Sequence, residues 1–413
     1  MRSEITKFKM TKLALCVSLA SGMAAVTTAP AHAFDVVEAG QPVVTGEPSR
    51  VGPPWNHRST INIPGTETDI AFGGYVKLDM LYDFDYDLGK ATDPYAIMGN
   101  PGDPDANRTD GRSDFTAYES RLNFRTHTMT DYGRLTTYFE GHFIPDGKFN
   151  LRHAYGKLNG FLAGRTWTNF MSFVGGTRTL ALGDPKGYAF ERQAQLRYTQ
   201  PVGAGNLSFA VEDPDTVVAR DDAGVADGES QLPDLTVRYE YKRLFALSGV
   251  ARKLSTNNIT NTVDDETTGY GVQAQFNLPF TPMTSLRGSA AYGEGIGNYM
   301  GNPGNTGHRN APDVYVNDDN ELEAVETRAF GVSLNHNWTD DWFSSVGFSR
   351  LDQDMPENYG SQFETIDYAF ANVIWDVTQR LTVGLEYQNA EVEQINGNSD
   401  DASRLQASAI FQF

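Results

Sequence analysis

The chain has 413 residues, of which 39% are hydrophobic and 12% aromatic, and its mean hydropathy is -0.44. This composition is too polar for a protein that crosses a membrane with helices. A transmembrane barrel has such a mixture, because only every second strand residue faces lipid. The formal net charge of -20 argues against nonspecific binding of nucleic acid.

Residues 1–33 have the features of a cleaved export signal. Arg2 and Lys7 give a positive start, residues 13–25 form a short apolar run, and Ala31-His32-Ala33 ends it in the A-x-A pattern. The run is shorter than the roughly 20 apolar residues of a membrane-spanning helix. The only cysteine of the chain, Cys16, lies in this segment. We therefore expect a thiol-free mature protein in an oxidising envelope.

Residues 34–67 are rich in Pro and Gly and have no apolar period. This composition predicts a tether or periplasmic extension rather than a packed element. The prolines also exclude a coiled coil.

From residue 68 to residue 413 the chain alternates with period two, the pattern of strands with two unlike faces. In the first run, Phe72, Val76 and Leu78 occupy even positions, whereas Lys77 and Asp79 occupy odd positions. A strand of a soluble sandwich alternates in the same way. Repetition along the whole chain, with aromatic residues at the ends of the apolar faces, favours a membrane barrel.

The alternating runs number about sixteen, as expected for an even-numbered closed barrel. They begin near Ile70, Phe115, Gly133, Phe149, Phe161, Tyr188, Asn206, Asp234, Leu244, Gly269, Thr284, Thr327, Asp341, Thr365, Arg380 and Arg404. Short and long connections alternate between them, which indicates periplasmic turns and extracellular loops. We therefore predict an all-β, transmembrane antiparallel β-barrel of 16 strands with long extracellular loops.

The last run ends on an aromatic residue, Phe413, with Leu405, Ala407, Ala409 and Phe411 on the same face. Such an ending is similar to the C-terminal signal that the barrel-assembly machinery recognises. Together with the export signal, it predicts a bacterial outer-membrane location, with lipid and lipopolysaccharide as surroundings.

Many arginines lie opposite the lipid face. The candidate pore-lining and anion-binding residues are Arg121, Arg125, Arg134, Arg152, Arg165, Arg178, Arg197, Arg238 and Arg287. In one interpretation each arginine pairs with a luminal carboxylate such as Glu119, Glu140, Glu191 or Glu240 and stiffens the wall. In the other, arginines exceed their partners at the narrowest point and attract anions.

The loop from Met171 to Gly187 follows the fifth predicted strand, where a loop that folds into the lumen would form the constriction. Arg178 lies on it, and Gly175 and Gly176 allow a sharp bend. Acidic residues concentrate in the exterior loops, where they could repel anions at the mouth, bind divalent cations that bridge lipid headgroups, or keep the loops soluble. Solubility is the commonest explanation, so we assign no metal site and no cofactor.

Five further segments are distinctive: residues 64–79 (PGTETDIAFGGYVKLD), 151–156 (LRHAYG), 161–167 (FLAGRTW), 197–201 (RYTQP) and 371–378 (ANVIWDVT). They resemble the DcaP-like family of outer-membrane porins. The resemblance implies a homotrimer of sixteen-stranded barrels that takes up small anionic, often dicarboxylic, compounds. It also implies that Arg152 and Arg165 lie in the pore wall. The predicted constriction loop differs from the family's usual acidic, Pro-containing stretch.

Two other functions remain open on the sequence alone. One is a structural or adhesive barrel without selective transport, which long loops such as residues 295–323 favour. The other is a barrel enzyme, because residues 198–200 (YTQ) are similar to the start of an outer-membrane phospholipase motif. The downstream His-x-Ser-Asn-Gly is missing, and the seven histidines form no H-E-x-x-H pair. The expected function is passive diffusion of small hydrophilic solutes.

Overall fold

The computed structural model describes residues 60–99, 103, 105–182, 187–220, 224–228, 230–257, 264–301 and 311–413. The predicted signal peptide and most of the predicted extension lie outside these residues. Residues 60–62, from the predicted extension, form the short strand β1 (Thr60–Asn62), which pairs with β2. Among the described residues, no helix is long and apolar enough to cross a membrane.

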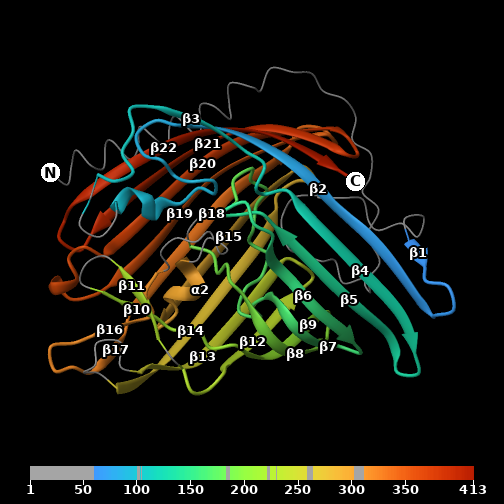
Figure 1. Ribbon diagram of the computed structural model, residues 1–413, viewed down its shortest axis with the longest axis horizontal. Helices are drawn as coiled ribbons and strands as arrows, with labels where there is room; N and C mark the ends of the chain where they lie inside the picture. The colour runs from blue at the N-terminus through green and yellow to red at the C-terminus, as the bar shows by residue number, and fades with distance from the viewer. Residues whose placement is uncertain are drawn as a thin grey trace.

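The main sheet is a closed antiparallel barrel (Figure 1). Its strands are β2 (Thr68–Asp83), β3 (Arg112–Thr116), β4 (Arg121–Thr130), β5 (Gly133–His142), β6 (Asn150–Leu158), β7 (Phe161–Trp167), β8 (Arg192–Val202), β9 (Gly205–Glu212), β12 (Asp234–Tyr241), β13 (Phe245–Asn257), β14 (Asp264–Pro279), β15 (Thr284–Glu294), β18 (Glu326–Asn337), β19 (Trp342–Asp354), β20 (Phe363–Thr378), β21 (Leu381–Gln394) and β22 (Ser399–Gln412).

Two pairings define the barrel count. β3 and β4 both pair with β2, one above the other, and so act as a single interrupted strand. The sheet closes where β2 pairs with β22, from Tyr75 opposite Gln412 to Asp83 opposite Arg404. The barrel therefore has 16 strands, and the predicted fold class is confirmed.

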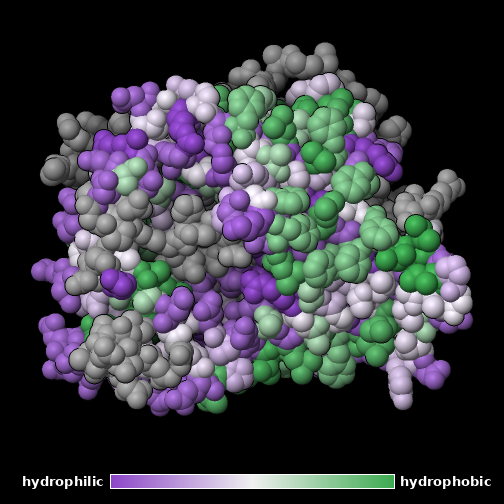
Figure 2. All heavy atoms as spheres, viewed as in Figure 1, coloured by the Kyte–Doolittle hydropathy of each residue, from purple (hydrophilic) through white to green (hydrophobic). Residues whose placement is uncertain are grey.

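The strands have the two faces that alternation predicts. On β2, Phe72 is 60% exposed and faces outward, whereas Lys77 is 2% exposed and faces the lumen. Figure 2 shows hydrophobic side chains gathered on the outside over β2 and β4, and mostly hydrophilic ones at the loop end. The outward face suits hydrocarbon, and the polar inner face suits a water-filled interior.

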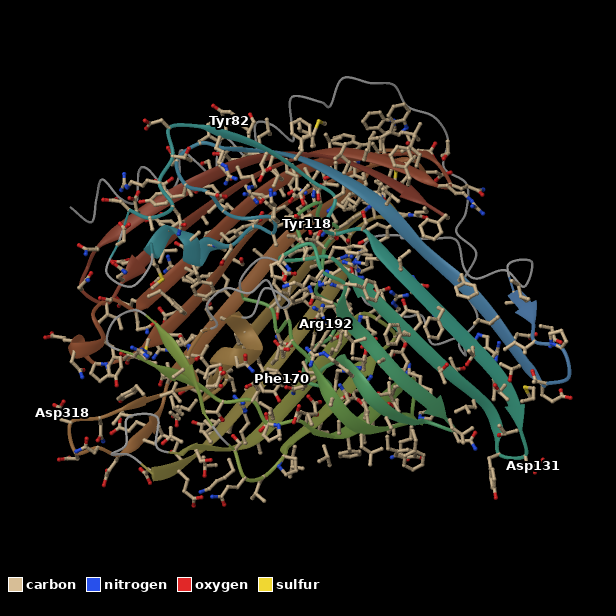
Figure 3. The ribbon with its side chains drawn as sticks, viewed as in Figure 1. Tyr82, Tyr118, Asp131, Phe170, Arg192 and Asp318 are labelled. Carbon is tan, nitrogen blue, oxygen red and sulfur yellow. The ribbon has the colours of Figure 1, made fainter. Side chains whose placement is uncertain are left out.

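The two ends of the barrel differ as predicted. Short turns join β4 to β5, β6 to β7 and β8 to β9, and long loops leave the other end. In Figure 3, Asp131 on a short turn and Asp318 on a long loop lie at opposite ends of the molecule. We call these the turn end and the loop end.

Two long loops form a second sheet at the loop end, which the sequence did not predict. It contains β10 (Val217–Ala219), β11 (Val225–Asp227), β16 (Val314–Val316) and β17 (Leu322–Ala324), with β10 parallel to β16. The Arg252 side chain of β13 fixes the base of both loops. It donates to Asp234 and Asp313 at 2.8 Å each, and all three side chains are fully buried.

Two further loops fold inward, in addition to the predicted one. The 3-10 helix η2 (Pro94–Met98) and the short helix α2 (Gly297–Gly301) lie inside the loop end. Tyr299 of α2 is fully buried, and it packs in one apolar cluster with Phe170 and Phe190. These loops have no hydrophobic period, so the sequence does not predict that they fold inward.

Candidate functional site

One loop crosses the inside of the barrel between β7 and β8. Because β7 is the fifth barrel strand, this is the loop that the sequence predicts to fold inward. At its start, Thr168 Oγ1 and the Asn169 backbone N–H donate to the Glu212 carboxylate of β9 at 2.5 and 2.7 Å. We call residues 168–191 the constriction loop.

The middle of the constriction loop lies directly on the wall. The backbone N–H of Gly175 donates to Gln275 Oε1 of β14 at 3.0 Å. A Cβ at Gly175 would lie 2.2 Å from the carbonyl oxygen of Gly288, so a larger residue would displace the loop. The predicted glycine pair thus allows a close backbone approach at Gly175.

The far end of the constriction loop is held by β20, β21 and β22. The backbone N–H groups of Leu180 and Ala181 donate to the Glu386 carboxylate at 2.7 and 3.2 Å. Glu386 also accepts from Asn372 Nδ2 at 2.9 Å, and Gln406 Nε2 donates to the Leu180 carbonyl at 3.0 Å. The loop therefore runs from β9 past β14 to β22 and covers this side of the lumen.

Three of the predicted arginines hold this loop. Arg178 makes a bidentate pair with Asp376 of β20 at 2.8 and 2.5 Å. Arg287 donates to the Gly176 carbonyl at 2.9 Å. Arg238 donates to the Met171 carbonyl, nearer the start of the loop. Their guanidinium groups are engaged in fixing the constriction, as the stiffening interpretation expects.

Two more predicted arginines lie on the opposite wall, toward the loop end. Arg152 Nε donates to Glu140 at 3.0 Å, and Arg121 lies 3.2 Å from Glu119. Arg152 is the extra residue of a β-bulge, because Glu140 pairs with His153 while Gly141 pairs with Leu151. The bulge explains the irregular alternation of this strand, since an inserted residue changes which side chains face the lumen.

Sequence reasoning missed Arg192, which lies beside them. Its guanidinium is 4.5 Å from the centre of the Trp167 ring, and that of Arg152 is 5.8 Å away. Figure 3 shows Arg192 in the middle of the barrel in this view. Strict alternation assigns the lumen to Gln193, the next residue, and so excludes Arg192. At the first residue of a strand that rule does not hold, so no pattern could have revealed it.

Glu191, the last residue of the constriction loop, adds a titratable group here. Its carboxylate accepts from the backbone N–H of Arg192 at 2.8 Å. Burial raises the pKa of Glu191 to about 7, although the nearby charges of Arg192 and Arg165 act in the opposite direction. The net charge of this part of the lumen therefore changes near neutral pH.

A row of cations continues on this wall toward the turn end, and we call Arg125, Lys157 and Arg197 the basic ladder. The charges of Arg125 and Arg197 both act on Lys157. Arg125 lies 5.3 Å from the ring centre of Tyr138, and Lys157 lies 5.2 Å from that of Tyr155. Within the described part of the chain, no carboxylate forms an ion pair with Lys157 or Arg197.

Two predicted arginines lie apart from this row. Arg134 is exposed near the turn end of β5. Arg165 pairs across the sheet with Ala154 and Ala194, in the register of the outward face, where Leu196 is 56% exposed. The pore-wall position that the resemblance implies for Arg165 therefore stays a prediction.

The described residues contain no group of three or more His, Cys, Asp or Glu that could hold a metal ion. Among the family models, that of the porin subfamily matches residues 61–410. The chain belongs to the porin subfamily. Its function in the broad sense is that of a channel in the bacterial outer membrane.

Solved structures agree with this family. The outer membrane channel DcaP of Acinetobacter baumannii is 20% identical, with a TM-score of 0.72 over 86% of this chain and 100% of that chain. The trimer form of OmpT from Vibrio cholerae is 12% identical, with a TM-score of 0.52 over 84% of this chain and 99% of that one. The anion-selective porin from Comamonas acidovorans is 12% identical, with a TM-score of 0.51 over 84% of this chain and 100% of that one.

At these identities the likeness concerns the fold. The first of these structures confirms the resemblance that the sequence motifs indicate. No curated protein gave a match. Family and fold point to a channel rather than to the barrel enzyme that the sequence left open.

Proposed function

We propose that this porin lets small hydrophilic solutes diffuse passively across the outer membrane and prefers small anions, including dicarboxylates. The basic ladder carries the proposal. Its side chains face a water-filled lumen, and Lys157 and Arg197 have no carboxylate partner in the described part of the chain. Fixed cations along a pore raise the local concentration of anions and lower that of cations. The Comamonas porin of similar fold is anion-selective by its description.

The arginines that hold the constriction loop contribute less to this preference. The charge of Arg178 is balanced by Asp376 in a bidentate pair. Replacing Arg178 with Glu would place two carboxylates together and loosen the loop, so a change in selectivity would have two causes. Lys157 and Arg197 have no such complication, and they are the better residues to test.

The ion preference can be measured as a reversal potential. Purified porin is inserted in a planar bilayer under a potassium chloride gradient, and the double variant Lys157→Gln/Arg197→Gln is compared with the unchanged protein. We expect a clear anion preference that shrinks in the double variant. Arg328→Gln is the control, because Arg328 is exposed on the outward face of β18. Cation preference in the unchanged protein, or equal shifts in both variants, would contradict the proposal.

We also propose a homotrimer. β7 has 7 residues and β9 and β12 have 8 each, whereas a tilted strand needs about 9–11 residues to cross the hydrocarbon core. This side of the wall is therefore low. A neighbouring copy would cover it, as the trimer form of the Vibrio porin suggests for this fold.

The remaining proposals concern export and surroundings. Residues 1–33 would be removed after export through the inner membrane. The barrel-assembly machinery would recognise β22, in which Phe411 is 51% exposed on the outward face. Lipid and lipopolysaccharide would surround the exposed wall. Residues 34–67 would remain as a periplasmic extension.

A further inference from the structure

The sheet of β10, β11, β16 and β17 is fixed at two distant points of the barrel rim, and we call it the loop-end sheet. Its root lies at β12 and β13, where Arg252 pairs with Asp234 and Asp313. Its opposite end lies against the loop between β19 and β20, which contains the 3-10 helix η3 (Glu357–Tyr359). Along the rim, β14, β15, β18 and β19 lie between these two points. The sheet therefore spans a wide part of the loop end (Figure 1).

Both faces of the loop-end sheet are packed. On one face, Val218 of β10 lies in an apolar cluster with Leu254 of β13. On the other face, the next residue, Ala219, lies in a cluster with Met355 and Tyr359 from the loop between β19 and β20. Successive residues of a strand point to opposite faces, so the sheet fills the space between these two parts of the rim.

Two side chains of the loop between β19 and β20 fix the end of the sheet that lies near η3. Gln362 Nε2 donates to the carbonyls of Arg220 and Gly224, on either side of the turn between β10 and β11, at 2.8 and 2.7 Å. The Tyr359 hydroxyl donates to the Val316 carbonyl of β16 at 2.9 Å and accepts from the Val316 N–H at 3.1 Å. Both side chains are buried, so water competes little for these bonds.

Side chains on the lumen face hold the same sheet from below. Arg252 of β13 and Gln353 of β19 are both buried on that face, and Gln353 Nε2 donates to the Pro312 carbonyl at 2.9 Å. Asp313 also accepts from the backbone N–H of Asn298 in α2 at 2.9 Å. Because α2 lies inside the loop end, the sheet and this helix form one block that lies over the lumen and narrows its mouth.

We propose that the loop-end sheet is a fixed roof over part of the mouth, that it limits the size of the solutes that enter, and that Gln362 and Tyr359 hold it in place. A rigid roof excludes solutes wider than the remaining opening and hinders small ions little. Size would then be selected at the mouth, before a solute reaches the constriction loop. The proposal rests on passive diffusion through the lumen, but it does not depend on anion preference.

Swelling of liposomes that contain the purified porin measures the size limit with uncharged sugars. Arabinose is the small probe and raffinose the large one, and the ratio of their rates corrects for the amount of folded porin. The double variant Tyr359→Phe/Gln362→Ala removes the bonds that fix the sheet near η3. We expect the raffinose rate relative to arabinose to rise severalfold in this variant, because the released sheet uncovers more of the mouth.

The matched control is Tyr315→Phe/Gln394→Ala, which makes the same two changes in bonds that do not join the sheet to the loop between β19 and β20. The Tyr315 hydroxyl donates to Glu323 within the sheet, and Gln394 Nε2 donates to the Ser361 carbonyl at 2.9 Å. The rate ratio should stay that of the unchanged porin. An equal rise in both double variants would refute the holding role of Gln362 and Tyr359.

A second variant displaces the sheet from its other side. Val218→Asp places a charge in the apolar contact with Leu254, where an unpaired carboxylate is too costly to stay buried. Val218 lies outside the barrel strands, so the barrel should still form. If the ratio rises here but not in Tyr359→Phe/Gln362→Ala, the roof is correct and those two residues do not hold it. If it rises in neither, the sheet does not limit solute size.

The reversal potential of the same preparations separates this proposal from the proposed function. Cation preference together with a raised sugar ratio would refute the anion preference and leave the roof. Anion preference with an unchanged ratio in both variants would refute the roof and leave the proposed function intact.

Discussion

The two sides of the lumen use charge in different ways. On the side of β14, β20, β21, β22 and β2, charged side chains hold loops, as Asp376 does with Arg178 and Glu386 does with Leu180 and Ala181. On the side of β4, β6 and β8, the basic ladder faces the lumen and holds no loop. One side therefore holds the loops that shape the pore, and we propose that the other sets its potential.

The difference shows that residue type alone does not define a role in this barrel. Arg178 and Arg197 both lie on inward-facing segments, yet one is neutralised by a bidentate partner and the other has no ion pair among the described residues. A neutralised arginine adds little to the potential along the pore, because its field is cancelled at short range. The pairing of Arg178 follows the stiffening interpretation, whereas the selective interpretation stays a prediction for Arg197.

The largest expected difference between the two sides of the lumen is in the loss of unfolding free energy when an arginine is replaced. Arg404 of β22 is fully buried and pairs with Asp83 at 2.6 and 2.8 Å, which fixes the loop after β2. Arg404→Met leaves the Asp83 carboxylate buried and unpaired, which should cost about 3–5 kcal/mol. Arg197→Met, on the other side, should cost less than about 1 kcal/mol. Urea unfolding of both variants in lipid vesicles measures the two free energies. Equal losses would remove the distinction between the two sides.

A smaller effect is expected when the constriction loop is released. Glu386 is fully buried and accepts from Leu180, Ala181, Asn372 and Gln388. Glu386→Leu leaves the Leu180 and Ala181 N–H groups without an acceptor, whereas Asn372 keeps the Arg178 carbonyl and Gln388 keeps Gln406 Oε1. Because the released loop can expose its N–H groups to luminal water, the total loss should be about 1–3 kcal/mol. The far end of the loop should then leave the wall. We expect Glu386→Leu to have a larger single-channel conductance with more current noise than the unchanged porin. Glu386→Gln should lie between these two proteins, because it retains one acceptor oxygen.

Unchanged conductance in Glu386→Leu would show that the loop keeps its position without this carboxylate. In that case Arg178 and Gly175 would be sufficient to hold it. The Glu386→Gln variant then serves as the reference for folding, since it has nearly the same size and polarity as the original residue.

The sequence predicted the barrel well, because alternation is a property of each strand alone. Phe72 and Lys77 could be assigned to opposite faces without knowledge of any other strand. The starts of the strands also lie close to their predicted places, since turn residues mark them. Even the inward loop was located, because its place after the fifth strand fixes which end it leaves.

The site was predicted only in part, because it depends on contacts between distant segments. Arg178 and Asp376 are 198 residues apart, so no local pattern tells that they pair. Arg152 sits at a bulge, and Arg192 at the first residue of a strand, where alternation fails. Alternation would have placed Lys157 in the lumen, since it lies two residues from the luminal Tyr155 on the same strand. The inward folding of α2 depends on buried contacts such as that between Tyr299 and Phe170.

The smallest effect is expected from pH, through Glu191 near the basic side. Burial raises the pKa of Glu191 to about 7. Above this pH the carboxylate is charged and offsets part of the neighbouring arginine charge, whereas below it the carboxylate is neutral. Anion preference should therefore grow modestly as the pH falls from about 8 to about 6. Reversal potentials at both values measure it. Glu191→Gln is neutral at every pH and should show the larger preference throughout; if its pH dependence equals that of the unchanged porin, Glu191 is not the group that titrates.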